Sequence, residues 1–422
     1  MASVPTEGST KETTKTSLWL ALALSALLLG TLFLRLLWLD KPAGALIFDE
    51  VYYVNAARVI LGWPVPEGAH YYGAPIGIDP NSEHLPLAKL VIAVSMRLFG
   101  DNAVGWRLPS VLMGTGAVGL LFLLLRRLSG RAGLALFAAF VFSLDNLAFV
   151  HSRIATLDIQ MVFFMLLGLY LYVAGRAVLA GAALALAVMS KLTGVYGVGA
   201  IAGYEVLRLL PQPQARAAWR DIAGNLALML GVGLVFFLLV LWPIDRQWTA
   251  FPDPLRHVAH ILQYGVNMTS DRYPSTIESA PWQWLVNQEP IVYLKVGNDV
   301  RVDGKLVQSQ PVVDFQGEMN PYVIFLAPLV LAYLLVRAVT TRESLPLFLL
   351  ALAGATYLPS VLTATLDHRA SYIYYFLPVL PALCAGIAYL MLDRRLPRYL
   401  PVAYALGVVF GFAMLFPFRA IP

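Results

Sequence analysis

Long apolar runs recur along almost the entire sequence, and each is close to the roughly 20 residues that a helix needs to cross a bilayer. They predict about eleven membrane-spanning helices, near residues 18–38, 106–125, 132–150, 155–174, 177–190, 192–209, 221–243, 320–338, 345–364, 371–391 and 399–417. Only Ser190 and Lys191 separate the fifth run from the sixth, so these two could also form one broken crossing. We therefore expect an all-α polytopic membrane protein.

The connections between the runs predict an orientation. The run 18–38 is too long for a signal-peptide core and is not followed by a small-residue cleavage site, which predicts an uncleaved anchor with residues 1–17 in the cytoplasm. Every second connection is basic, as expected of cytoplasmic loops. The arginines of these basic connections are Arg126, Arg127, Arg131, Arg176, Arg208, Arg216, Arg220, Arg337, Arg342, Arg394, Arg395 and Arg398. The long connections 40–105 and 244–320 then lie outside, and so do all six histidines: His70, His84, His151, His257, His260 and His368.

Composition narrows the function classes. With 59% hydrophobic and 13% charged residues and a mean hydropathy of +0.69, the chain is unlike any ordinary soluble protein. The single cysteine, Cys384, excludes an intrachain disulfide and a cysteine-based metal site. The net charge of +5 does not form a basic patch interleaved with aromatic residues, so nucleic acid is not an expected partner. No glycine-rich phosphate loop or dinucleotide fingerprint is present.

The first long loop contains two predicted surface helices. Asp49 and Glu50 stand at the start of a segment with apolar residues at helical spacing, which predicts a helix on the membrane surface with Asp49 as N-cap. The positive end of that helix would keep both carboxylates ionised. A capped helix with no further role would give the same pattern. A second amphipathic segment opens at His84 and ends near Gly100.

Ionisable residues gather near the predicted outer ends of the spans, where each needs a partner or a role. Pairing of Arg153 with Asp158, or of Arg107 with a loop carboxylate, would be a purely structural explanation. The alternative is a lipid-borne substrate, because nucleotide sugars are normally absent outside the cytoplasm. A polyprenyl-phosphate sugar would place its phosphate among arginine and lysine side chains, and a carboxylate could take the proton of an acceptor hydroxyl.

Seven segments, in this order along the chain, resemble the motifs of the protein O-mannosyltransferase family. They are Phe48-Asp-Glu-Val-Tyr52, His84-Leu-Pro-Leu-Ala-Lys89, Gly105-Trp-Arg-Leu-Pro-Ser110, Ser152-Arg-Ile-Ala-Thr-Leu-Asp158, Met189-Ser-Lys-Leu-Thr-Gly194, Tyr273-Pro-Ser to Trp282-Gln-Trp284, and Arg369-Ala-Ser-Tyr-Ile-Tyr-Tyr-Phe-Leu-Pro378. The resemblance covers the chain from about residue 18 to the last span. It implies a GT-C glycosyltransferase fold over residues 18–422, with membrane-surface helices in the first outer loop.

The resemblance also implies roles for individual residues. Asp49 would be the base, and Glu50 would orient the acceptor or support the base. Residues assigned to the donor phosphate and lipid are Arg107, Lys191, Arg369, Tyr372, Tyr375, Lys89 and His84, with Arg153, Asp158, His368 and Trp282 in support. The reaction would be one inverting displacement through an oxocarbenium-like state, served by a carboxylate of ordinary low pKa and needing no cofactor or metal. His257 and His260 lie one helical turn apart but lack a third zinc ligand.

The chain departs from the family pattern in places. Leu85 and Ala88 replace a proline and a glycine of the usual His-Pro-Pro-Leu-Gly-Lys, and Tyr374-Tyr375-Phe376 stands where Tyr-His-Tyr is common. The second long loop is too short for the β-trefoil domain of eukaryotic members, which indicates a prokaryotic plasma-membrane enzyme. Within it, residues 291–307 have the pattern of a hairpin with Gly304 at the turn.

The predicted function is transfer of mannose from a polyprenyl-phosphate-mannose donor to Ser/Thr hydroxyls of translocated proteins, with membrane lipids and the Sec translocon as partners. A GT-C enzyme with another acceptor, such as a lipid A aminoarabinose transferase or a cell-wall glycan mannosyltransferase, would share the same donor site. A lipid flippase or transporter would show broken spans and midplane charges in two related halves, and no such repeat is found.

Overall fold

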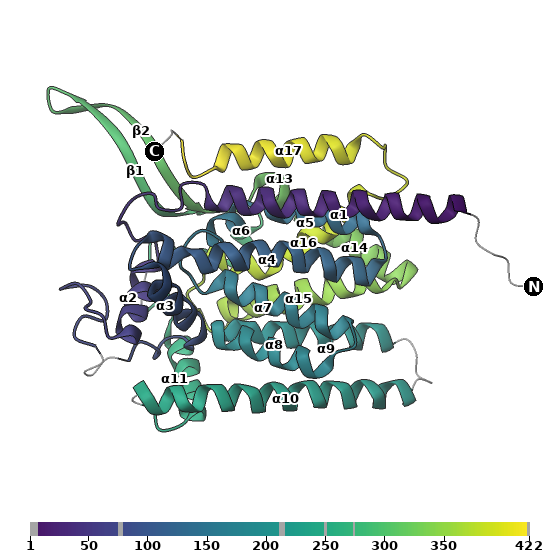
Figure 1. The fold of residues 1–422 in the computed structure, drawn as a ribbon, viewed down its shortest axis with the longest axis horizontal. Coiled ribbons are helices and arrows are strands. Elements are labelled where there is room, and N and C mark those ends of the chain that lie inside the picture. The colour runs from purple at the N-terminus through teal and green to yellow at the C-terminus, as the bar shows by residue number, and fades with distance from the viewer. Residues whose placement is uncertain (1–6, 75–78, 211–215, 249–250, 273–274, 420–422) are drawn as a thin grey trace, which may run out of the picture.

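The computed structural model describes residues 7–74, 79–210, 216–248, 251–272 and 275–419. Most helices run side by side along one direction in a bundle (Figure 1). The elements are α1 (Glu7–Leu36), α2 (Glu50–Leu61), α3 (Leu87–Phe99), α4 (Ala103–Ser129), α5 (Ala132–Ser143), α6 (Asn146–His151), α7 (Asp158–Val173), α8 (Ala177–Ser190), η1 (Leu192–Val195), α9 (Tyr196–Leu209), α10 (Arg216–Trp248), α11 (Pro254–Asn267), α12 (Pro281–Trp284), β1 (Ile291–Val302), β2 (Lys305–Gly317), α13 (Pro321–Ile324), α14 (Ala327–Thr341), α15 (Ser344–Leu366), η2 (Ile373–Val379), α16 (Leu380–Met391) and α17 (Leu400–Leu415).

The helical, membrane-spanning character predicted from the sequence is confirmed. Six stretches of the described chain are long and apolar enough to cross a bilayer: Leu18–Leu36, Ala103–Ser129, Trp219–Gln247, Pro321–Thr341, Ser344–Leu366 and Ile373–Met391. Four apolar helices are shorter: α5, α7, α8 and α17. The predicted run 132–150 is interrupted, because Asp145 accepts a hydrogen bond from the Ala148 amide and starts a separate helix, α6.

The pair of runs at 177–209 is a helical hairpin rather than one broken crossing. A Cβ atom added to Gly194 would lie 2.4 Å from the Ala187 carbonyl carbon, and one added to Gly197 would lie 2.7 Å from the Leu184 side chain. Residues progressively later in the chain than Lys191 therefore pack against residues progressively earlier than it. The chain thus reverses direction after Lys191. At Gly194, where the nearest atoms are backbone, only glycine permits so close an approach.

The surface helices collect at one end of the bundle, where α2, α3 and α11 lie together (Figure 1). The two amphipathic helices expected in the first loop are present as α2 and α3, which pack through Val54, Ala57, Ile92 and Met96 against Trp106 at the start of α4.

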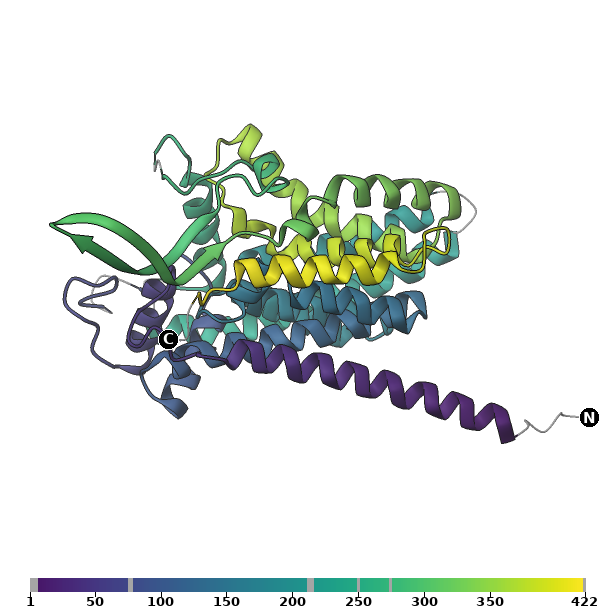
Figure 2. The same ribbon diagram turned by 90° about the horizontal axis from the view of Figure 1, so that it is seen from above.

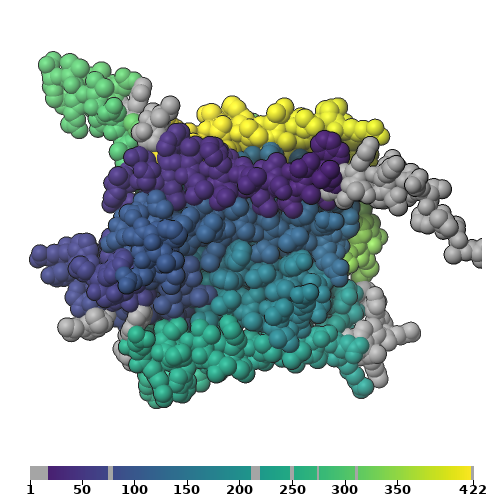
Figure 3. Space-filling model, in the orientation of Figure 1, coloured from purple at the N-terminus to yellow at the C-terminus, as the bar shows by residue number. Residues whose placement is uncertain are grey.

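A two-stranded antiparallel hairpin projects from the same end, well outside the bundle (Figures 2 and 3). Asp303 and Gly304 form its turn with φ values of 50° and 75°, as a type I′ hairpin turn requires. The predicted hairpin is therefore confirmed, although β2 continues to residue 317. Tyr293 and Phe315 anchor its base in the core, whereas most of its length is exposed.

Candidate active site

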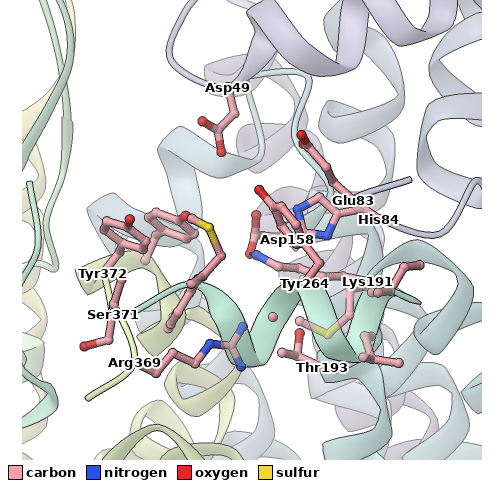
Figure 4. Close-up of a pocket in the computed structure, with 18 of the residues that line it drawn as sticks. Asp49, Glu83, His84, Asp158, Lys191, Thr193, Tyr264, Arg369, Ser371 and Tyr372 are labelled. Atoms are coloured by element: carbon pink, nitrogen blue, oxygen red, sulfur yellow. Dashed lines mark hydrogen bonds and ion pairs between the residues drawn. The ribbon is translucent and has the colours of Figure 1, made fainter. Parts of the chain in front are cut away.

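A cavity of about 780 Å³ opens among the surface helices. Its walls come from the loop before α2, the loop before α3, η1, α11 and the segment leading into η2 (Figure 4). The predicted site residues that line it are Asp49, His84, Asp158, Lys191, Arg369, Tyr372 and Tyr375. Six others do not line it: Glu50, Lys89, Arg107, Arg153, His368 and Trp282. The structure thus divides the predicted residues into two groups.

Asp49 occupies the N-cap position of α2, but its side chain makes no capping hydrogen bond and points into the cavity (Figure 4). Burial raises the pKa of its carboxyl to about 7; the positive charge of Lys191 opposes this shift, while Asp158 and Glu83 add to it. The expectation of a carboxylate with an ordinary low pKa is therefore wrong, because loss of water outweighs the attraction of Lys191. A pKa near 7 suits a general base.

Glu50, the neighbouring acid, faces away from the cavity and is completely buried. One carboxylate oxygen accepts from Arg107 Nε at 2.8 Å and from the Ala155 amide at 2.8 Å. The other accepts from Arg107 Nη2 at 2.9 Å and from the Ile47 amide at 2.7 Å. The two acids of the motif therefore differ in position: Asp49 can contact a substrate, whereas Glu50 holds the loop that carries Asp49.

The guanidinium of Arg107 has no N–H left for a donor phosphate. Besides the two bonds to Glu50, it donates to the carbonyls of Leu39, Lys41 and Ala45 at 2.8–3.2 Å. All five of its N–H groups are thereby used. The donor-binding role predicted for Arg107 does not fit this geometry, whereas the alternative of pairing with a loop carboxylate does.

Arg153 and Lys89 also hold backbone. Arg153 donates at 2.6 Å to the carbonyls of Leu34 and Leu37 at the end of α1, and Asp158 pairs with Lys191, so the alternative of an Arg153–Asp158 pair is not formed. Cations are favourable there because the last carbonyls of a helix lack partners. Lys89 donates at 2.6 Å to the carbonyls of Pro80 and His84, and so fixes the loop before α3.

Lys191 is the partner of Asp158 at the wall of the cavity. The Lys191 Nζ atom lies 2.6 Å from an Asp158 carboxylate oxygen and 5.1 and 5.2 Å from the ring centroids of Tyr374 and Tyr375. The carboxylate and the two rings fix the ammonium group in one place. Tyr372 stacks on Tyr374 at a centroid distance of 5.6 Å and extends this aromatic wall.

Arg369 lies across the cavity from Asp49 (Figure 4). Its guanidinium forms no ion pair or hydrogen bond with any side chain or carbonyl in the described part of the chain. A Cβ atom added to Gly265 of α11 would lie 3.4 Å from its Nη2 atom, so α11 approaches it closely. A half-buried cation that has no anionic partner among the described residues is well suited to an anionic substrate group.

The remaining predicted residues have clear positions. Burial, followed by the charges of Lys191 and Lys89, lowers the pKa of His84 to about 3, so His84 is neutral and can donate a hydrogen bond without adding charge. His368 is exposed, and Trp282 is 54% exposed. Tyr273 lies outside the described residues.

His257 is bonded to Asp245 Oδ1 at 2.8 Å and to the Asn81 carbonyl at 2.9 Å. It therefore ties α11 to the first loop. No group of three potential metal ligands occurs in the described ranges.

Several cavity residues escaped the sequence analysis: Glu83, His70, Tyr53, Thr193, Tyr264 and Ser371. Glu83 adjoins the motif that begins at His84, and Ser371 lies within the last motif. Their proximity to these motifs could have identified both as candidate site residues. His70 is 3.9 Å from Glu83. Tyr264 comes from α11, whose sequence gives no indication that it approaches the first loop.

Comparisons with known proteins find similar membrane glycosyltransferases. Residues 90–244 match the family model described as dolichyl-phosphate-mannose-protein mannosyltransferase. The polyprenol-phosphate-mannose–protein mannosyltransferase of Mycobacterium tuberculosis is 27% identical over 89% of this chain and 83% of its own length. The Mycolicibacterium smegmatis protein of the same name is 26% identical over 91% and 86%.

Solved structures show the same fold. The S. cerevisiae protein O-mannosyltransferase Pmt1-Pmt2 complex bound to the sugar donor matches with a TM-score of 0.71 over 94% of this chain and 90% of that one, at 12% identity. ArnT from Cupriavidus metallidurans bound to undecaprenyl phosphate matches with a TM-score of 0.58 over 94% and 76%, at 18% identity. The chain therefore has the fold of these membrane glycosyltransferases and is similar over most of its length to mycobacterial protein mannosyltransferases.

Proposed function

We propose that the chain is an inverting glycosyltransferase that moves mannose from polyprenyl-phosphate-mannose to a Ser or Thr hydroxyl of a polypeptide. The observation that carries this proposal is the placement of Asp49 and Arg369 on opposite walls of one cavity (Figure 4). An inverting displacement needs a base on one side of the anomeric carbon and a site for the leaving phosphate on the other. The names of the mycobacterial relatives support the choice of donor and acceptor.

In this mechanism Asp49 accepts the proton of the acceptor hydroxyl as its oxygen bonds to the anomeric carbon. The bond from that carbon to the phosphate oxygen breaks, and its electron pair stays with the phosphate. Arg369 and Lys191 stabilise the negative charge that develops there. Because Asp158 already balances Lys191, the unpaired Arg369 supplies most of the net charge that phosphate requires.

The apolar part of the cavity fits the lipid end of such a donor. Val188, Leu192 and Val195 line it on one side, and Ile261 and Leu262 of α11 on the other. A polyprenyl chain between them would hold the phosphate near Lys191 and Arg369.

We place the reaction on the extracytoplasmic face of a prokaryotic plasma membrane. Both long connections contribute to the cavity wall and lie opposite the arginine-rich connections, and basic connections favour the cytoplasm. A lipid-borne donor is consistent with that side.

The structural likeness to ArnT leaves a lipid acceptor as the second candidate, and the family match favours a protein. The deciding experiment incubates the purified chain with radiolabelled polyprenyl-phosphate-mannose and either a Ser/Thr peptide or lipid A. Label in the peptide, lost in Asp49→Asn while donor binding is retained, supports the proposal. Label only in lipid A, or full turnover by Asp49→Asn, contradicts it.

A further inference from the structure

The two long edges of the projecting hairpin differ. At its base, β2 has a further neighbour: the Asp314 amide donates to the Pro417 carbonyl at 2.7 Å, and the Arg419 amide donates to the Val312 carbonyl at 2.9 Å. β2 also contains Pro311, which has no amide hydrogen to offer. The free edge of β2 is therefore partly covered and partly interrupted.

The edge of β1 is open. In the described ranges of the chain, the backbone of residues 291–302 has β2 as its sole hydrogen-bonded neighbour, and β1 contains no proline. A long unpaired edge is normally avoided because it can pair with another extended chain. Its persistence on one strand, beside a strand whose base is covered, indicates that it has a use.

The root of β1 adjoins the loop that carries the base. Tyr293 stacks on Phe48, the residue before Asp49, with ring centroids 4.1 Å apart. The Tyr293 hydroxyl lies 2.8 Å from His151 Nε2, which fixes the ring. An extended chain that follows β1 toward its root is therefore directed to Asp49.

Beyond the root, one face of β1 is apolar without covering any core. Val296, Val300 and Val302, beyond the bulge between Val292 and Leu294, are 42–53% exposed. Exposed apolar side chains on a projecting element are typical of an interaction site. Since alternate residues of a strand share a face, these valines would contact alternate side chains of an added strand.

We propose that the open edge of β1 binds the acceptor polypeptide by strand addition and delivers it in extended form to Asp49. The inference rests on the proposed function and names how its acceptor is held. Strand addition uses main-chain hydrogen bonds, so it accepts many sequences and requires an unfolded segment. Each added residue extends the contact by about 3.3 Å, so affinity should rise with the length of the acceptor.

The test compares acceptor peptides on the intact enzyme and on a shortened-hairpin variant. In that variant Asn-Gly replaces residues 298–310 and joins the cross-strand partners Gly297 and Pro311, which leaves the base of the hairpin in place. A blocked single threonine and a ten-residue peptide serve as acceptors. We expect the intact enzyme to favour the long peptide in kcat/KM, and the variant to lose that preference while keeping its rate on the blocked threonine.

A second arm scans the long peptide with backbone N-methyl groups on the intact enzyme. Strand addition predicts losses of about three- to tenfold at every second residue, because alternate amides donate to the neighbouring strand. Uniform tolerance of N-methylation, no length preference, or equal loss on both acceptors in the variant would overturn the proposal. Equal loss on both acceptors would make the hairpin a structural or membrane-contacting element. Absence of transfer to every acceptor would instead overturn the proposed function itself.

Discussion

Glu50→Gln should destabilise this protein before it affects any chemistry. Each Glu50 oxygen accepts two hydrogen bonds, one from Arg107 and one from a backbone amide. A glutamine amide placed in either orientation faces two donors with its own NH₂ group and leaves the buried Arg107 without a counter-ion. Breaking a buried ion pair on one side costs about 3–5 kcal/mol. At about 2–4 °C per kcal/mol for a large domain, the unfolding midpoint should fall by roughly 6–20 °C.

The assay is thermal unfolding of the detergent-purified variant, with mannose transfer measured well below its midpoint. Arg107→Gln alone should be similarly destabilised, and the double variant less than the sum, because the uncompensated charge is gone. Asp49→Asn is the matched control, since it removes the adjacent carboxylate without breaking a hydrogen bond of the described structure. A Glu50→Gln enzyme with an unchanged unfolding midpoint but no mannose transfer would refute the structural role. Glu50 would then act on the substrate or the base, as the sequence motif implied.

Further predictions concern the cavity. With the Asp49 pKa at about 7, kcat/KM should rise about tenfold per pH unit below 7 and level off above it; a profile still flat down to pH 5 would contradict Asp49 as the base. Because burial raises this pKa in the folded state, the wild-type protein loses stability as the pH rises from about 4 to 7. Asp49→Asn lacks this loss, so its unfolding midpoint should increase relative to that of the wild type over the same pH range. Arg369→Gln should raise the donor KM about ten- to a hundredfold with little change in the unfolding midpoint, and Arg369→Lys should recover part of the loss. Asp158→Asn should weaken the fixation of Lys191 and lower kcat more than donor affinity, whereas unchanged kcat would make that pair purely structural.

Much of the fold could be predicted because its elements follow local rules. Hydrophobic run length predicts the spans, amphipathic spacing predicts α2 and α3, and the Asp303-Gly304 turn accounts for the hairpin. The break at Asp145 was missed, since the apolar character of 132–150 continues through it while one side-chain hydrogen bond ends the helix. Such a break depends on the partner atom rather than on composition.

The site was harder to predict because the sequence does not say which way a side chain points. Motif matching brought together residues that line the cavity and residues that hold its loops. Only the positions of the side chains separate Lys191 and Arg369, which line the cavity, from Arg107 and Arg153, which bond to groups of the protein outside it. In the sequence alone, these four cations near the outer span ends cannot be distinguished from one another. In three dimensions two are satisfied by a buried acid or by carbonyls, and two line the cavity.

The Asp49-Glu50 pair shows why adjacent acids need not share a task. Asp49 can act as a base near neutral pH because it has lost most of its water, and a desolvated carboxylate tends to move its loop toward solvent. Glu50 prevents that movement, since it accepts two hydrogen bonds from Arg107 of α4, one from the Ala155 amide after α6 and one from the Ile47 amide of its own loop. Arg153 fixes the other end of the connection at the last turn of α1. The raised pKa of Asp49 thus depends on the hydrogen bonds of Glu50, Arg107 and Arg153 that hold its loop in place. Any variant that weakens these bonds should return the pKa of Asp49 toward its ordinary value.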